Sequence, residues 1–208
     1  MSRPSKSPPP FPTKPFGLLL VEGGDEQKLC EAVAGPSVWS GLVCWKASGR
    51  ADLPNLAKLA TRDPSFSYAR SVGVLLDMED SPTETTKLVQ ETRDALKVTL
   101  PFVHGAFVPG AAPKVGVFIS PDGQQTGSID GLCKQAVCNP SLASCVNALV
   151  ACAGQPHTTV ARGMKGWLDA YLAMLSKPMR LHQALEDPQV FDLKHPAFDP
   201  LRVFLQAL

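Results

Sequence analysis

The first half of the chain carries its hydrophobic residues in short uninterrupted runs. Three such runs, at residues 16–21, 71–76 and 115–119, each stop at a polar or turn-forming residue. Runs without polar alternation are typical of strands that are buried on both faces of a sheet. A shorter run at residues 42–45 adds a fourth candidate. The pattern therefore predicts four strands.

Helical spacing of apolar residues connects these strands. It is seen at residues 25–33 and 52–60, where apolar side chains recur every three or four positions. Residues 81–84 combine a capping box with proline at the first helical position, so a helix is expected to begin there. Alternation of strands and helices implies a parallel sheet covered on both faces. The expected fold is α/β, with a central, mostly parallel four-stranded sheet flanked by helices.

The second half of the chain reads as helical throughout. One helix is expected to begin after Asn139 and to end at Gly154, and a second is expected over residues 158–175. Short helical pieces follow, separated by prolines. We expect this helical C-terminal extension to pack on the same domain as the sheet.

Three regions are therefore expected along the chain. Residues 1–15 are rich in proline and lack periodicity, which predicts a disordered arm. Residues 16–125 form the α/β core, and residues 126–208 form the helical part.

Composition and charge limit the partners and the cellular compartment that we expect for the protein. Its 208 residues carry a net charge of +1, so no global field draws it to nucleic acid, and such contact would need a local patch. Because the N-terminus lacks a secretory signal and no apolar run approaches the ~20 residues of a membrane span, we expect a soluble, cytoplasmic protein. The six cysteines lack zinc-site spacing, and they are interpreted as free, mostly buried thiols.

Acidic residues follow two of the buried runs directly. Glu22 precedes a glycine pair, and Asp77 is followed two positions later by Glu79. Ligands of open α/β sheets bind at the carboxyl ends of the strands, where these side chains are expected to meet. The segment after Asp77 is expected to be extended, so Asp77 and Glu79 point the same way, with Asp80 capping or backing them.

Carboxylates without histidine suit Mg²⁺ or Mn²⁺ better than zinc. An alternative is that these acids only cap the following helices, and Asp25, Glu26 and Asp80 fit that description well. Glu22 and Asp77 do not lie at natural cap positions, so for these two we favour metal binding.

Two segments that carry these acids resemble the Toprim domain of topoisomerases, bacterial primases and small nucleases. They are LLLVEGGDEQKLCEAV, which contains Glu22, and VGVLLDMED, which contains Asp77 and Glu79. The Toprim pattern has a glutamate after the first strand and Asp-x-Asp after the third. Glu79 replaces the second aspartate of that pattern, which keeps the charge and lengthens the reach.

The chain also resembles a family of small stand-alone Toprim-like proteins of undefined function, related to the overcoming-lysogenization-defect nucleases. The segment VGVFISPDGQQTGSIDGLC places Asp130 where that family has a glutamate. The later segments KGWLDAYLAML and HPAFDPLRVFL are similar to the ending of the same family. The resemblance spans residues 16–208.

The resemblance implies Mg²⁺-dependent phosphodiester chemistry, as in a nuclease or related hydrolase. Glu22 would act as metal ligand or general acid/base, and Asp77 and Glu79 would hold the metal. Asp130 would complete a two-metal site, and Lys165 is the candidate cation for the phosphate or the transition-state charge. A solvated helix lysine is the alternative for Lys165.

A second hypothesis is a binding or regulatory module that keeps the fold without catalysis and acts with a protein partner. The altered acids at Glu79 and Asp130 favour it, so whether the chain is an enzyme stays open. A nucleotidyltransferase is ranked last, because primases carry zinc and helical regions that this chain lacks. Of the remaining polar residues, His157 is the one histidine worth testing, and the basic set is interpreted as a solvated face: Lys46, Arg50, Lys58 and Arg62.

Overall fold

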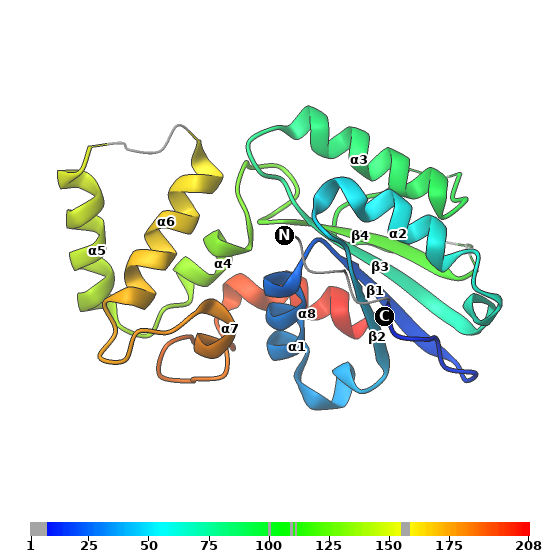
Figure 1. The fold of residues 1–208 in the computed structure, drawn as a ribbon, viewed down its shortest axis with the longest axis horizontal. Coiled ribbons are helices and arrows are strands. Elements are labelled where there is room, and N and C mark those ends of the chain that lie inside the picture. Colours follow the sequence, from blue (N-terminus) through cyan, green and yellow to red (C-terminus); the bar gives the residue numbers. More distant parts are fainter. Residues whose placement is uncertain (1–7, 100, 109, 111, 155–158) are drawn as a thin grey trace, which may run out of the picture.

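A computed structural model gives the structure of the protein over residues 8–99, 101–108, 110, 112–154 and 159–208. Its sheet has the strand order β2-β1-β3-β4, and each neighbouring pair is parallel (Figure 1). This confirms the predicted α/β fold with a four-stranded parallel sheet. The four strands are β1 (Phe16–Val21), β2 (Leu42–Lys46), β3 (Ala69–Asp77) and β4 (Lys114–Ser120).

The sheet is covered on both faces, because successive side chains of each strand point to opposite sides. Leu18 and Leu20 pack in a core with α2 (Leu53–Ala60) and α3 (Pro82–Ala95). Leu19 and Val21 pack in a second core on the other face. That second core includes residues of α1 (Gly24–Trp39) and α8 (Asp199–Gln206). Continuous apolar strands were therefore the correct sign of a sheet buried on both sides.

Four further helices extend the second core beyond the edge of the sheet. Trp167 and Tyr171 of α6 belong to the same buried cluster as Leu19 and Phe118 of the strands. The outer helix, α5, packs on α6 at the far end of the molecule (Figure 1). One core thus includes residues of the sheet and of the helical part. The four helices are α4 (Ile129–Gln135), α5 (Pro140–Cys152), α6 (Val160–Ala173) and α7 (Leu181–Ala184).

Local capping explains where the longer helices begin. The Ser81 hydroxyl accepts a hydrogen bond from the Glu84 amide at 3.3 Å, as the capping box predicted for α3. The Asn139 side chain likewise accepts from the Leu142 amide at 2.9 Å and starts α5. Helix α1 continues past its predicted end at residue 33, after a kink at Gly35, whose φ is 71°.

The segment before β1 differs from the predicted disordered arm over residues 8–15. The Phe11 ring is buried and stacks on Trp45, with 4.2 Å between ring centroids and 6° between planes. The Trp45 indole nitrogen donates a hydrogen bond to the Pro9 carbonyl at 2.9 Å. The buried Phe11 ring and this hydrogen bond together hold the proline-rich segment against the sheet. Residues 1–7 of the predicted arm lie outside the described residues.

All six cysteines are free thiols, but half of them are exposed, so the prediction of mostly buried thiols was wrong. The exposed ones are Cys138, Cys145 and Cys152, and two of these lie on the outer helix α5. Among the helices that the described residues form, none combines the length and the apolar character needed to cross a membrane.

Candidate functional site

Two of the predicted acids meet where β1 and β3 end. Glu22 follows the last residue of β1, and Asp77 is the last residue of the adjacent strand β3. The Glu22 Oε1 atom accepts a hydrogen bond from the Asp77 amide at 3.0 Å. Both side chains are buried, with Glu22 9% and Asp77 4% exposed. Parallel neighbours in the sheet therefore bring together two carboxylates that are 55 positions apart in the chain.

Asp77 also connects the sheet to the helical part. Its Oδ1 atom accepts a hydrogen bond at 3.0 Å from the amide of Ile129, the first residue of α4. Asp130, the next residue of that helix, accepts a hydrogen bond from the Ser128 hydroxyl at 3.0 Å. The start of α4 thereby brings Asp130 to the same edge of the sheet as Asp77.

Glu79 reaches the site by a route that differs from the prediction. The segment after Asp77 is not extended, because Glu79 has a left-handed φ of 54°. This conformation costs a non-glycine residue roughly 1–2 kcal/mol. Two backbone hydrogen bonds with Gly127 hold it, from the Glu79 amide at 2.7 Å and to the Glu79 carbonyl at 2.9 Å. The direction of the Glu79 side chain is therefore set by a tertiary contact rather than by strand periodicity.

Most of the predicted residues line a cavity of about 150 Å³, called here the acidic cavity. Asp77, Glu79, Asp130 and Lys165 all line it, and Glu22 lies behind it, hydrogen-bonded to Asp77. The cavity therefore combines predicted acids with the predicted cation. Its other lining residues are Asp25, Glu26, Ser128, Ile129, Ala161 and Arg162.

Three charged residues of this cavity were not predicted as part of the site. Asp25 and Glu26 were interpreted as helix caps, yet both line the cavity from the first turn of α1. Their position could have been inferred, because a helix that follows Glu22 directly begins at the same edge of the sheet. Arg162 lies three residues before Lys165 in α6, so one helical face carries both cations. That spacing was the available signal.

Burial and mutual repulsion make these acids hard to ionise. Burial raises the pKa of Glu22 from 4.5 to about 7, although the Asp77 amide and Arg50 lower it, and Glu26 and Glu79 add to the rise. Burial, together with the carboxylates of Glu22, Glu26 and Glu79, raises the pKa of Asp77 well above its ordinary range. Without a cation the cluster therefore retains protons near neutral pH.

The acids on the α1 and α4 side of the cavity show the same trend. Burial raises the pKa of Glu26, and the Asp25 and Asp130 carboxylates add to that rise. Burial also raises the pKa of Asp130, which the Ser128 hydroxyl and the Lys165 ammonium partly offset. Lys165 thus acts electrostatically on the acid that it was predicted to accompany.

Arg50 departs from the solvated basic face to which it was assigned. It is half-buried, and its guanidinium donates a hydrogen bond to the Thr85 hydroxyl at 2.7 Å. Thr85 is buried and in turn donates to the Met78 carbonyl at 2.8 Å, next to Asp77 in the chain. Arg50 is thereby fixed close enough to Glu22 to lower its pKa.

The donor atoms at this edge of the sheet are carboxylate and hydroxyl oxygens, which are the ligands that Mg²⁺ and Mn²⁺ prefer. Their chemistry fits the predicted metal class. Within the described ranges, however, no group of three or more histidine, cysteine, aspartate or glutamate side chains has the geometry to hold an ion. Metal binding therefore requires the side chains to move closer together, and it stays a prediction.

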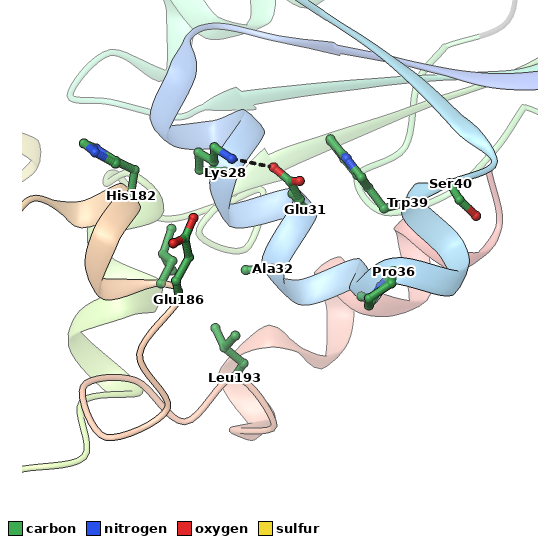
Figure 2. A pocket seen from close by; sticks show the side chains of 11 residues that line it. Lys28, Glu31, Ala32, Pro36, Trp39, Ser40, His182, Glu186 and Leu193 are labelled. Carbon is green, nitrogen blue, oxygen red and sulfur yellow. Dashed lines mark hydrogen bonds and ion pairs between the residues drawn. The ribbon is translucent and has the colours of Figure 1, made fainter.

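A larger cavity of about 660 Å³ lies elsewhere, between α1 and the region of α7 (Figure 2). Trp39, Pro36 and Ala32 line it from α1, while His182 and Glu186 line it from the other side. Its one drawn interaction is the Lys28–Glu31 ion pair of 2.9 Å within α1 (Figure 2). None of the acids predicted from the sequence lines it. Volume alone would point here, whereas buried charge points to the acidic cavity.

None of the histidines that the structure describes lines the acidic cavity. His104 is half-buried, and its Nδ1 atom accepts a hydrogen bond from the Ile119 amide at 3.0 Å. This hydrogen bond gives His104 a structural role beside β4. His157, the histidine that seemed worth testing, lies outside the described residues.

Comparison with known proteins identifies a family whose model matches most of the chain. The model of the family described as "Protein of unknown function (DUF3226)" matches residues 17–208. A solved structure of the C-terminal region of the Xanthomonas campestris pv. campestris OLD protein is 14% identical to the chain. That similarity covers 93% of this chain and 82% of that chain, at a TM-score of 0.36, which is too low to support an inference. A search of curated proteins found no match.

Proposed function

The chain belongs to the DUF3226 family, and we propose that it carries out Mg²⁺-dependent phosphodiester chemistry on nucleic acid, as a Toprim-like nuclease does. The observation that supports this proposal is the acidic cavity at the carboxyl ends of β1 and β3. It combines five carboxylates with Arg162 and Lys165. The resemblance of the segments around Glu22, Asp77 and Asp130 to Toprim-like nucleases points to the same chemistry.

The residues that would hold Mg²⁺ or Mn²⁺ are Asp77, Glu79 and Asp130, with Glu22 behind them. Asp77 and Glu22 each use one carboxylate oxygen to accept a backbone hydrogen bond, which fixes the orientation of the group. The other oxygen of Asp77 is then its ligand atom, whereas the other oxygen of Glu22 would either bind the metal or carry a proton. When bound, such ions stabilise the charge on the attacking and leaving oxygens of a phosphodiester.

The protein side chains would supply proton transfer and phosphate binding. Because Glu22 has a pKa of about 7, it exchanges a proton readily at neutral pH, and Oε2 is the atom left to carry it. This property suits a general acid/base. Lys165 and Arg162 line the same cavity and would bind the phosphate and its transition-state charge.

The experiment is a cleavage assay with single-stranded and duplex DNA and RNA, in Mn²⁺, in Mg²⁺ and in a chelator. We expect cleavage that needs the metal, and a loss of at least about 100-fold in Asp77→Asn. Asparagine can still accept the hydrogen bond from Ile129, so the variant removes charge without removing that contact. The matched control is Glu91→Gln on the exposed side of α3, which should cleave like wild type. Equal cleavage by Asp77→Asn and wild type would reject the assignment.

The second candidate is a non-catalytic Toprim-like module that acts with a protein partner. Two observations favour it: the lack of a ready metal-binding group among the described residues, and the departures from the Toprim pattern at Glu79 and Asp130. Calorimetric titration with Mg²⁺ and Mn²⁺ separates the two candidates. Binding that Asp77→Asn abolishes supports the enzyme, and no binding at millimolar metal supports the module.

A further inference from the structure

Asp80 lies in the short loop after β3 that also carries Met78 and Glu79, called here the acidic loop. It connects this loop to α6, a helix that lies far away in the chain. Asp80 directly follows Glu79, and its Oδ1 atom accepts a hydrogen bond at 3.1 Å from the amide of Ala161. Ala161 lies in the first turn of α6, 81 positions further along the chain. The amides of a first helical turn lack partners within their own helix, so a carboxylate there serves as a cap. Asp80 therefore caps α6 from outside.

The N-terminal part of α6 is the part that reaches the cavity. Ala161, Arg162 and Lys165 all line the cavity, so the cap lies next to Arg162 and about one turn before Lys165. The helix's own cap, Thr159, contributes a longer hydrogen bond of 3.4 Å from the Arg162 amide. Two caps thus hold the start of α6, and one of them comes from the loop that carries the acids.

The rest of α6 is held by a different set of contacts. Trp167, Leu168 and Tyr171 are buried in the core shared with the sheet, and the Trp167 indole donates a hydrogen bond to Asn147 at 2.8 Å. Nearer the start of the helix, Ala161 is buried and Met164 lies beside Gly127 and Gly131. The core therefore holds the body of the helix, and its first turn is placed by these contacts together with its two caps.

The loop that carries Asp80 is itself well fixed. Glu79 is paired with Gly127 through two backbone hydrogen bonds, and the Met78 carbonyl accepts from the buried Thr85 hydroxyl. Because this loop is rigid, the Asp80 carboxylate that accepts the hydrogen bond fixes the position of the Ala161 amide. This contact links the acids to the cations directly, beside the indirect link through Asp77, α4 and α6.

We propose that Asp80 is a positioning residue that holds the N-terminal part of α6, which carries Arg162 and Lys165, over the acidic loop. Asp77 and Glu79 then face the metal, while Arg162 and Lys165 face the phosphate. The proposal rests on the proposed function, because the phosphate is the group that both sides must meet. Asp80 itself touches neither the metal nor the substrate in this arrangement.

The first arm of the test is kinetic and uses the full chain with Mn²⁺ and a nucleic acid that wild type cleaves. Asp80→Ala should lower kcat by about 10–100-fold, because small displacements of positioned groups have effects of this size. Asp80→Asn should recover most of that loss, since its amide oxygen can accept the same hydrogen bond. Thr159→Ala removes the other cap of α6 and should lower kcat in the same direction.

The matched control is Ser81→Ala. Ser81 is the neighbour of Asp80 in the same loop, but its hydroxyl caps α3 rather than α6. A merely structural role predicts that Asp80→Ala and Ser81→Ala lower thermal stability alike and leave kcat unchanged. Positioning predicts that kcat falls in Asp80→Ala but not in Ser81→Ala, with the calorimetric affinity for Mn²⁺ within twofold of wild type in both variants.

The second arm does not depend on activity. Hydrogen exchange of the Ala161 amide should be about fivefold faster in Asp80→Ala and unchanged in Ser81→Ala, since only the first variant removes its acceptor. If exchange responds in this way but wild type cleaves nothing, the proposed function fails and the tie between loop and helix stands. Unchanged exchange at Ala161, or equal kcat for Asp80→Ala and wild type, overturns the proposal.

Discussion

Replacing Glu79 by glycine should make the metal-free protein more stable. Glu79 has a φ of 54°, which glycine adopts without the cost that a side chain brings. The Glu79 carboxylate also raises the pKa of the buried Glu22 and Asp77, which means that it repels them when all three are charged. The substitution removes both penalties at once, while the backbone pair with Gly127 can remain.

The size of the effect follows from these two contributions. Relief of the left-handed conformation is worth about 1–2 kcal/mol, offset by about 0.4–1 kcal/mol for the greater freedom of glycine in the unfolded chain. Loss of like-charge repulsion in a partly buried cluster adds about 1 kcal/mol at pH 8. We therefore expect Glu79→Gly to raise the free energy of unfolding by roughly 2 kcal/mol in a chelator.

Lys97 supplies the matched control. It is the other non-glycine residue with positive φ among the described residues, with φ of 60°, and it lies exposed after the end of α3. Lys97→Gly relieves the same backbone conformation without touching the acids, so its gain should be about 1 kcal/mol, roughly half of that expected for Glu79→Gly. The difference between the two variants measures the repulsion within the site.

The assay is urea denaturation at pH 8, first with chelator and then with Mn²⁺. A ligand that binds the folded state raises stability by about 2.7 kcal/mol at 100 times its Kd. Wild type and Lys97→Gly should both gain from Mn²⁺, whereas Glu79→Gly should gain less and lose its advantage. The reasoning is refuted if Lys97→Gly gains as much as Glu79→Gly in chelator, or if Mn²⁺ stabilises all three proteins equally.

Two further predictions concern pH and the N-terminal segment. Because the pKa of Glu22 rises from 4.5 to about 7 on folding, the folded metal-free protein binds more protons in that interval and should lose roughly 3 kcal/mol of stability as pH rises through it. Urea titrations at several pH values should show this slope, and Glu22→Gln should flatten it; an unchanged slope would contradict the assignment. Phe11→Ala should lower the free energy of unfolding by about 3 kcal/mol, because the ring is buried against Trp45. Thermal denaturation would show the loss, with the exposed Val103→Ala as a control that should barely change, and equal melting temperatures would mean that the segment does not pack.

The elements of the fold could be predicted because their signals are local. Uninterrupted apolar runs marked the strands, and the capping box at Ser81 marked the start of α3. The edge at which the acids meet followed from the topology, because parallel strands end on one side of a sheet. Glu22 and Asp77 could therefore be paired from sequence alone.

The details of the cavity could not be predicted, since they depend on contacts between distant parts of the chain. The left-handed φ of Glu79 follows from its pairing with Gly127, and sequence offered strand periodicity instead. Arg50 was placed on a solvated face because its acceptor, Thr85, lies 35 positions away. Phe11 sits in a stretch whose composition indicates disorder, and its burial depends on a site beside Trp45 that only the folded sheet provides.

The most direct test of the metal site is a crystal structure of the full chain grown with Mn²⁺, with anomalous scattering recorded to locate the ion. We predict a manganese peak in the acidic cavity, with carboxylate oxygens of Asp77 and Glu79 within about 2.2 Å of it and Glu22 or Asp130 completing the ligands. The same crystal grown with Asp77→Asn should lack the peak. A cavity without manganese at saturating concentration, or an ion bound only by other residues, would contradict the assignment of this cavity as a metal-dependent site.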